Sequence, residues 1–393
     1  MMSQTKKALP ILFAIMFLVM VGFGIIIPVL PFYAEEIGAS PTELGLLMAV
    51  YSLMQLLFAP IWGKVSDRIG RKPVIIIGIA GLSLSFFLMG ASSTLGMLFA
   101  ARFIGGILSA ANMPTVMAYV ADITTEEDRG KGMGVIGAAT GLGFVFGPAM
   151  GGVFSKISLS MPFFIAGFSS LLTLLLVWFL LKESLTEEAK QSQNKQGASL
   201  KQALGGSYSI LYFLQLFISL SLSGLEATFA YFGAQKAGLG TVELGYIFMI
   251  MGVASAFVQG GLVGRMTKRF GEGAVIQIGI VISAIGFGLI LLVDDFATAA
   301  IFLTIFGIGN GVIRPSVSAL LTKASTAGHG SATGFLSSFD SLGRIIGPPL
   351  GGWLFSITIG LPYISGILLS GVAFVLYRLY TIQSRKAALA FDN

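Results

Sequence analysis

The chain alternates between long apolar runs and short polar segments. Runs of about 20 apolar residues, the length that a membrane-spanning helix needs, recur on both sides of a polar stretch at residues 182–206. The pattern predicts an all-α membrane protein with twelve transmembrane helices, near residues 10–32, 43–63, 73–92, 95–120, 131–155, 161–181, 207–234, 243–265, 273–293, 296–321, 332–356 and 360–380. We therefore expect an N-terminal six-helix bundle (1–181), a cytoplasmic linker (182–206) and a C-terminal six-helix bundle (207–393).

The composition supports the membrane assignment. Hydrophobic residues make up 55% of the 393 residues and charged residues only 11%, whereas soluble domains carry about 25% charged residues. This excludes a large soluble domain, a nucleic-acid binder and an enzyme with a sizeable aqueous portion. The chain has no cysteine, so disulfides and thiolate metal sites are excluded as well. We expect no enzymatic activity, no metal and no cofactor.

The basic residues predict how the chain is oriented in the membrane. Of the 24 Lys and Arg residues, 19 lie in the two tails and in every second loop, 2 lie in the remaining loops and 3 lie within spans. Cytoplasmic loops carry an excess of Lys and Arg. Both termini are therefore expected in the cytoplasm, and the protein in the cell membrane.

The two halves of the chain repeat each other. At a shift of 200 residues, one glycine- and proline-containing string falls on another: Gly143, Gly147, Pro148, Gly151 and Gly152 fall on Gly343, Gly347, Pro348, Gly351 and Gly352. At a shift of 201, Gly63, Arg68 and Gly70 fall on Gly264, Arg269 and Gly271. Because six spans is an even number, the halves are parallel repeats, an arrangement typical of transporters that move two bundles about a central site.

Two motifs carry a resemblance to a known family. Residues 63–72 read GKVSDRIGRK in the turn between spans 2 and 3, and residues 143–152 read GFVFGPAMGG in span 5. They are similar to the signature loop of the major facilitator superfamily and to the antiporter motif of its drug:proton branch. Residues 27–31 and 102–106 also match that branch. The whole chain resembles the NorA- and Bmr-like multidrug efflux transporters.

The resemblance implies roles for both motifs. In the loop, it implies a cytoplasmic latch that gates the conformational change, formed by Gly63, Asp67, Arg68, Gly70 and Arg71. The second-half copy, residues 264–271, has no acidic residue, so its latch is expected to be weaker. In span 5, it implies a seam that prevents leakage and favours export, formed by Gly143, Gly147, Pro148, Gly151 and Gly152.

Ionisable residues within spans are costly to bury and are usually functional. Five occur here, and we expect them to serve proton coupling: Arg102, Glu226, Arg314, Asp340 and Arg344. Glu226 has no opposite charge nearby in sequence, and a desolvated carboxylate is suited to proton exchange near neutral pH. Asp340 and Arg344 are four residues apart on one helix face, so a simple ion pair between them remains an alternative.

The resemblance supports a role in proton coupling for three of these residues, but the chain departs from the family pattern at one position. Glu226 occupies the position of the span 7 acid of NorA-like pumps, while Arg102 and Arg314 match basic residues of spans 4 and 10. Such pumps carry a second acid three residues before the span 10 arginine, where this chain has Gly311. Asp340 is a candidate for the missing carboxylate.

Polar and aromatic side chains within the spans are candidates for a substrate pocket. Together they suit an amphipathic or cationic aromatic molecule through apolar contact and cation–π attraction; they are Gln55, Asn112, Phe144, Phe229, Tyr231, Asn310 and Phe339. For any single Phe, packing or lipid contact is a simpler interpretation than contact with a substrate.

The expected function is the export of hydrophobic, often cationic drugs by a monomer in exchange for protons, with the proton gradient as the energy source. Two alternatives remain open. One is an exporter of a specific physiological solute such as a sugar, nucleoside or lipid. The other is a membrane receptor that transports nothing.

Overall fold

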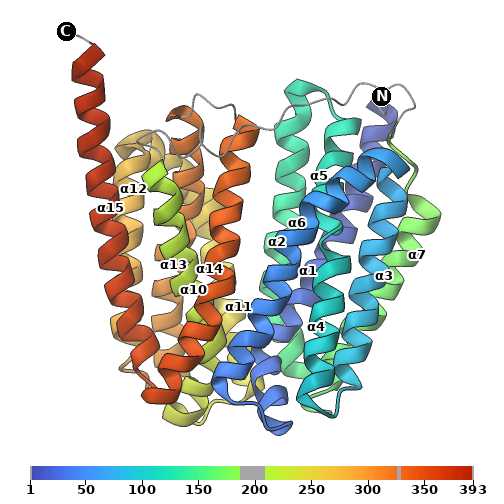
Figure 1. Cartoon of the computed structure of the whole chain (residues 1–393), viewed down its shortest axis with the longest axis horizontal. Helices are drawn as coiled ribbons and strands as arrows, with labels where there is room; N and C mark the ends of the chain where they lie inside the picture. Colours follow the sequence, from blue (N-terminus) through green and yellow to red (C-terminus); the bar gives the residue numbers. More distant parts are fainter. Residues whose placement is uncertain (1, 186–208, 325–328, 392–393) are drawn as a thin grey trace. The chain divides into compact units, whose positions relative to one another are not determined.

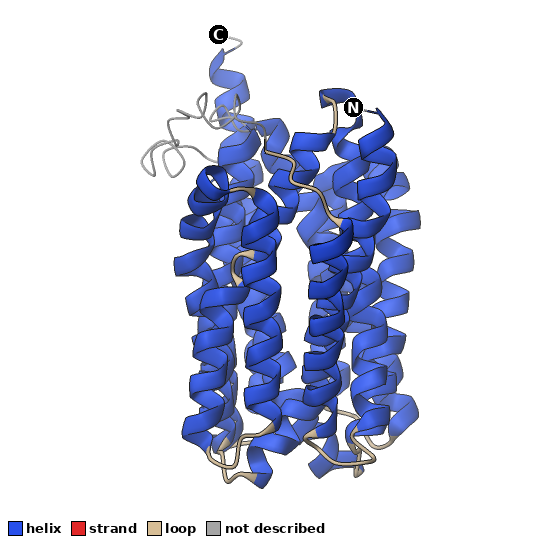
Figure 2. Ribbon diagram, turned by 90° about the vertical axis from the view of Figure 1, so that its right-hand side faces the viewer, coloured by secondary structure: helices blue, strands red, loops and turns tan. Residues whose placement is uncertain are grey.

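The structure is a computed structural model and describes residues 2–185, 209–324 and 329–391. Within these ranges every regular element is a helix and no strand occurs (Figure 2). The helices lie side by side lengthwise within each half of the chain (Figure 1). They are α1 (Met2–Glu36), α2 (Pro41–Ile69), α3 (Arg71–Gly90), α4 (Leu95–Ser109), α5 (Asn112–Ile123), α6 (Glu126–Phe154), α7 (Met161–Leu180), α10 (Ser209–Ala237), α11 (Thr241–Phe257), the π-helix η1 (Val258–Leu262), α12 (Val263–Ile290), α13 (Phe296–Ala324), α14 (His329–Ile357) and α15 (Leu361–Phe391).

Ten helical segments of the described chain are long and apolar enough to cross a membrane. One of them, Thr241–Ile290, is 50 residues long and contains a non-helical residue at Gly271, so it covers two of the predicted spans. The helix α14 covers the predicted span 332–356 with 29 residues. The nearly all-helical membrane fold is confirmed, whereas the count of twelve spans stays a prediction.

The predicted span 95–120 is interrupted in the structure. The helix α4 ends at Ser109 and α5 begins at Asn112. Pro114 explains the interruption, because it has no N–H and its ring crowds the carbonyl four residues earlier, at Ala110.

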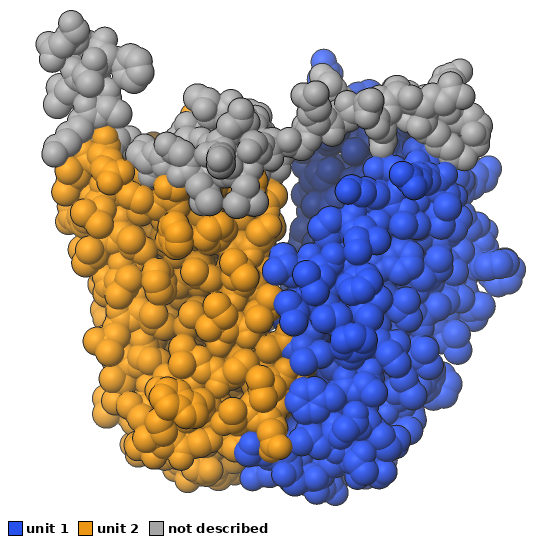
Figure 3. Space-filling view, in the orientation of Figure 1, with its two compact units in different colours: residues 1–40, 50–194, 240–249 blue, residues 41–49, 195–239, 250–393 orange. Residues whose placement is uncertain are grey.

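The chain divides into two compact units (Figure 3). Unit 1 comprises residues 1–40, 50–194 and 240–249, and unit 2 comprises residues 41–49, 195–239 and 250–393. The predicted bundles differ from these units by two short segments, because the start of α2 clusters with unit 2 and the start of α11 clusters with unit 1. Of the predicted linker 182–206, only residues 182–185 lie within the described chain.

In each unit, the repeated glycine motif brings two helices into backbone contact. In unit 1, a Cβ added to Gly147 of α6 would lie 2.7 Å from the Cα of Gly24 in α1. In unit 2, a Cβ added to Gly351 of α14 would lie 2.9 Å from the Cα of Gly224 in α10. Only glycine permits such an approach. The repeat seen in the sequence is therefore also a repeat of helix packing, with Gly24 and Gly224 again 200 residues apart.

Glycines at the ends of these motifs explain why the start of α2 belongs to unit 2 and the start of α11 to unit 1. A Cβ at Gly152 would meet the backbone of Thr241 at the start of α11, and a Cβ at Gly352 would meet the backbone of Pro41 at the start of α2. A hydrogen bond of 2.6 Å between the hydroxyls of Ser155 and Thr241 reinforces the first contact. The same motif thus packs a long helix along its length and anchors a second helix at its end.

Candidate functional site

Four of the five intramembrane ionisable residues come together in unit 2. Nη1 of Arg344 lies 3.9 Å from Oε2 of Glu226, and Nε of Arg344 lies 3.5 Å from Oδ2 of Asp340. Nη2 of Arg314 lies 3.8 Å from the same Oδ2. The residues belong to α10, α13 and α14, so only the tertiary fold brings them together. Arg344 pairs with Asp340, as the simple alternative supposed, and also faces Glu226.

The two carboxylates differ in how far their charge is compensated. Asp340 faces two guanidinium groups and accepts hydrogen bonds from Gln215 Nε2 at 2.8 Å and from the Ser219 hydroxyl. Glu226 faces the guanidinium of Arg344 at a longer distance. The side chains of Glu226 and Asp340 are only 18% and 11% exposed, whereas that of Arg314 is 55% exposed. Glu226 is therefore a mostly buried acid with weak compensation.

Sequence reasoning did not assign Ser219 to the site. A signal was nevertheless present, because Gln215, Ser219, Ser223 and Glu226 are spaced by four, four and three residues along a mostly apolar helix. This spacing places them on one face of α10. A polar stripe of this kind predicts a buried polar partner on the neighbouring helix, and Asp340 is that partner.

The fifth ionisable residue, Arg102, lies in unit 1 on α4. Its guanidinium carbon is 4.3 Å from the ring centre of Tyr51, a cation–π geometry. The Tyr51 hydroxyl is 2.6 Å from the Ser109 hydroxyl and accepts a hydrogen bond from Gln55 Nε2 at 2.9 Å. Arg102 Nε is buried without a hydrogen-bond partner in the described part of the chain. The predicted residues Arg102 and Gln55 thus meet through Tyr51.

Aromatic rings extend this group in unit 1. The ring of Phe23 is 5.2 Å from that of Tyr51 and 6.5 Å from that of the predicted Phe144, centre to centre. Asn112 packs against α3, where a Cβ added to Gly78 would meet its side-chain oxygen. Both amide atoms of Asn112 are buried and lack a partner within the described ranges.

The predicted aromatic residues of unit 2 are mainly packed inside the protein. Phe229 is completely buried and Tyr231 is 4% exposed. The ring of Phe339 lies 5.5 Å from that of Tyr212 and 5.2 Å from that of Phe213. Asn310 is half-buried in α13. Complete burial favours a packing role for Phe229 in this conformation, and the substrate role of the whole set stays a prediction.

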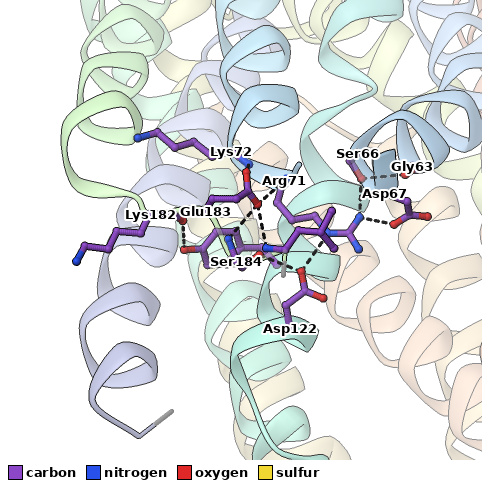
Figure 4. A network of polar contacts seen from close by, with 11 residues as sticks. Gly63, Ser66, Asp67, Arg71, Lys72, Asp122, Lys182, Glu183 and Ser184 are labelled. Carbon is purple, nitrogen blue, oxygen red and sulfur yellow. Dashed lines mark hydrogen bonds and ion pairs between the residues drawn. The ribbon is translucent and has the colours of Figure 1, made fainter. Parts of the chain in front are cut away.

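The signature loop forms a polar network centred on Arg71 (Figure 4). The side chain of Arg71 is 3% exposed, and its guanidinium lies 2.5 Å from Asp67 Oδ1 and 3.1 Å from Asp122 Oδ2. It also donates to the Ser66 hydroxyl at 2.7 Å. Arg68, which the resemblance placed in the latch, is exposed. Within unit 1, Arg71 and not Arg68 therefore makes the central contacts of the loop.

A carboxylate from the start of the linker completes the network. Glu183 accepts hydrogen bonds from the backbone N–H groups of Arg71 at 2.9 Å and Lys72 at 3.0 Å (Figure 4). These groups begin α3, and an anion stabilises a helix N-terminus. Ser184 donates to Asp122 at 2.9 Å. Sequence reasoning missed Asp122, Glu183 and Ser184, because they lie about 50 and 110 residues from the loop in sequence.

The glycines of the loop have different roles. Gly70 has a φ of 113°, a conformation that favours glycine, and it turns the chain directly into α3. A Cβ at Gly63 would meet no atom within 4 Å, so this glycine is not required by packing within unit 1.

The second half contains a counterpart with reversed charges. At the repeat shift of 201, Arg71 corresponds to Glu272 and Asp122 to Lys323, and the carboxylate of Glu272 forms an ion pair with Nζ of Lys323. Each pair follows a glycine of positive φ, Gly70 or Gly271. The second-half loop was expected to lack an acid, but the acid lies one residue beyond the compared string.

We expect the reversed pair to contribute modestly to stability. Lys323 is 67% exposed, and exposed ion pairs contribute about 0.2–1 kcal/mol. Lys323→Glu places two negative charges together and should lower the midpoint of thermal unfolding by a few degrees. Adding Glu272→Lys should restore the midpoint. Failure of the double variant to recover would show that the two side chains act separately.

Comparisons with known proteins agree with this architecture. The chain matches the family model of the Major Facilitator Superfamily over residues 12–272 and 260–392. It is 34% identical to Multidrug resistance protein 1 of Bacillus subtilis (strain 168), covering 92% of this chain and 93% of that protein. It is 28% identical to Quinolone resistance protein NorA of Staphylococcus aureus (strain COL), covering 94% and 96%.

A solved structure extends the likeness to the fold. The crystal structure of the nucleoside transporter NupG superimposes with a TM-score of 0.75 over 95% of this chain and 98% of that one, at 16% identity. So low an identity concerns the fold alone. Together with the match of the family model to both halves and the two motifs seated in their helices, it establishes that the chain belongs to the Major Facilitator Superfamily and is a multi-pass membrane transporter.

Proposed function

We propose that the chain exports hydrophobic, often cationic drugs by alternating access, in exchange for protons. Relatives named for multidrug and quinolone resistance support drug export. The observation that carries the proton coupling is Glu226, a mostly buried carboxylate whose one ion pair among the described residues is with Arg344, at 3.9 Å.

The exchange follows from the charge of Glu226. On the cytoplasmic side Glu226 loses its proton, and the resulting carboxylate attracts a cationic drug. On the outer side a proton binds Glu226, removes that attraction and releases the drug. The proton gradient supplies the energy, so the proposal requires no cofactor.

We further propose that the remaining predicted residues act around this step. Arg344, Asp340 and Arg314 form the charged surroundings of Glu226, and Arg102 belongs to the polar group of unit 1. The Arg71 network holds the loop at the cytoplasmic ends of α2 and α3. Both termini are placed in the cytoplasm by the distribution of Lys and Arg, and a monomer suffices for the mechanism.

Transport by the purified protein in liposomes tests the proposal. With an imposed pH gradient, acidic on the side that receives the drug, we expect ethidium to move against its own gradient while protons move in the opposite direction. Collapse of the pH gradient with an ionophore should stop the net movement. Ethidium movement at the same rate with and without the pH gradient would contradict proton coupling.

The same assay separates the alternatives. Absence of ethidium movement together with movement of a labelled sugar, nucleoside or lipid would indicate an exporter of one physiological solute. Absence of movement for every compound would favour a receptor.

A further inference from the structure

A buried polar stripe on α10 meets Asp340 of α14 inside unit 2. As whole residues, Gln215, Ser219 and Ser223 are 2%, 3% and 2% exposed, and Asp340 is 8% exposed. Buried polar side chains are unfavourable unless they hydrogen-bond to one another. Their clustering therefore indicates a specific polar contact between the two helices.

The two oxygens of Asp340 have separate partners. Oδ1 accepts from Gln215 Nε2 at 2.8 Å and from the Ser219 hydroxyl, and Gln215 Nε2 also lies 3.1 Å from the Ser219 hydroxyl. Oδ2 faces the guanidinium groups of Arg344 at 3.5 Å and Arg314 at 3.8 Å. The donors of α10 thus fix the plane of the carboxylate and direct Oδ2 toward the arginines.

Close helix packing makes this arrangement rigid. A Cβ added to Gly343 would lie 2.6 Å from Cβ of Ser219 and 2.8 Å from the backbone nitrogen of Leu220, so α14 approaches α10 closely at this level. Gln215 Oε1 has no hydrogen-bond partner within the described residues. The polar interactions of Gln215 are therefore concentrated on Asp340 and Ser219.

The position of Asp340 determines the position of Arg344. Arg344 lies within reach of both carboxylates, at 3.5 Å from Asp340 and 3.9 Å from Glu226. If Asp340 is displaced, Arg344 is free to move toward Glu226. The charged groups that face the two acids are Arg344 from α14 and Arg314 from α13. From α15, the ionisable Tyr363 contacts α10 at Thr228, 3.5 Å between hydroxyls.

We propose that Ser219 and Gln215 are positioning residues of the proton step: they hold Asp340 as the fixed counter-ion of Arg344 and Arg314, and thereby reserve proton exchange for Glu226. This inference rests on the proposed function. It assigns different roles to two acids that share one arginine. Asp340 stays charged throughout the cycle, and Glu226 alone changes its protonation.

Infrared difference spectroscopy tests the assignment without any substrate. We titrate the purified protein and follow the C=O band of protonated carboxyl groups. Because the chain has 18 Asp and Glu residues that contribute to this region once protonated, the observable is one component of the band, which should be absent in Glu226→Gln and present in Asp340→Asn. In Ser219→Ala its midpoint should move toward acid pH, on the order of half a unit, because Arg344 shifts toward Glu226 and stabilises its charged form. Gln215→Met should move it in the same direction.

Matched variants separate positioning from general damage. Ser219→Cys keeps a weak hydrogen-bond donor of similar size without adding a methyl group where Gly343 packs closely, and it should shift the midpoint less than Ser219→Ala does. Ser221→Ala removes a hydroxyl from the same helix that is bonded to the Phe217 carbonyl at 2.9 Å, and it should leave the midpoint unchanged. A titrating band that disappears in Asp340→Asn, or an unchanged midpoint in folded Ser219→Ala, would overturn the proposal.

Ethidium transport adds a second reading. If wild-type protein transports with the gradient, the pH of half-maximal transport should move in Ser219→Ala as the infrared midpoint does. If wild-type protein moves no ethidium while the infrared band behaves as expected, drug export fails and the assignment of Ser219 and Gln215 stands.

Discussion

Glu226→Gln should abolish ethidium transport driven by a pH gradient and reduce it to the level of protein-free liposomes. The amide is nearly equal in size to the carboxyl group but neither carries a charge nor exchanges a proton. Among the residues that the structure describes in unit 2, it leaves Arg344 with Asp340 as its acidic contact. Ethidium binding should weaken as well, because the attraction between the carboxylate and the cation is lost. Transport rate and equilibrium binding measured on the same preparation check both effects.

A second carboxylate provides the control for this variant. Glu127 lies exposed in the first turn of α6, and Glu127→Gln makes the same chemical change outside the apolar part of the chain. It should retain gradient-driven transport. If Glu226→Gln transports as well as Glu127→Gln, the proton site lies elsewhere, and Asp340 becomes the next candidate.

Gly147→Ala should destabilise the protein far more than its small size suggests. The new Cβ would lie 2.7 Å from the Cα of Gly24 and 2.7 Å from the carbonyl oxygen of Val21, both backbone atoms of α1. Relief requires the two helices to separate, and overpacking of this kind costs about 1–3 kcal/mol. We expect a clear drop in the midpoint of thermal unfolding in detergent and a low yield of folded protein.

Gly137→Ala on the same helix is the matched control. A Cβ at Gly137 would meet no atom within 4 Å, and alanine is favoured over glycine in a helix by about 1 kcal/mol. This variant should unfold at the same temperature as the wild type or above it. An equal loss of stability in both variants would refute the assignment of Gly147 to a backbone contact.

Much of the fold was predictable because helices in a membrane leave a strong signal. Apolar runs of sufficient length located each helix, and even the interruption at Ala110 has a visible cause in Pro114. The string from Gly143 to Gly152 and its repeat from Gly343 to Gly352 were visible in the sequence. The structure shows that they pack closely against α1 and α10, respectively. The packing of the start of α2 in unit 2 and of the start of α11 in unit 1 was not predictable. The pattern of residues within a helix does not show which other helix it contacts.

The candidate site was predicted in part, for the same reason. A charged residue within an apolar run is visible in the sequence alone, and this identified four unusual residues: Glu226, Asp340, Arg344 and Arg314. Their pairing was open because it crosses three helices. In the loop, the sequence does not distinguish the environments of Arg68 and Arg71. Only the structure shows that Arg71 is buried between two acids while Arg68 is exposed.

By itself, the sequence determined that this chain is a helical membrane protein built from two parallel repeats, and which of its residues are costly to bury. The tertiary structure alone decided which of those residues meet. In the structure, Ser219 and Gln215 donate hydrogen bonds to one carboxylate oxygen of Asp340, and two arginines face the other oxygen. The physical reason is that hydropathy reports the environment of each residue along its own helix. Contacts between helices depend on their rotation and separation, which close approaches such as Gly343 to Ser219 set.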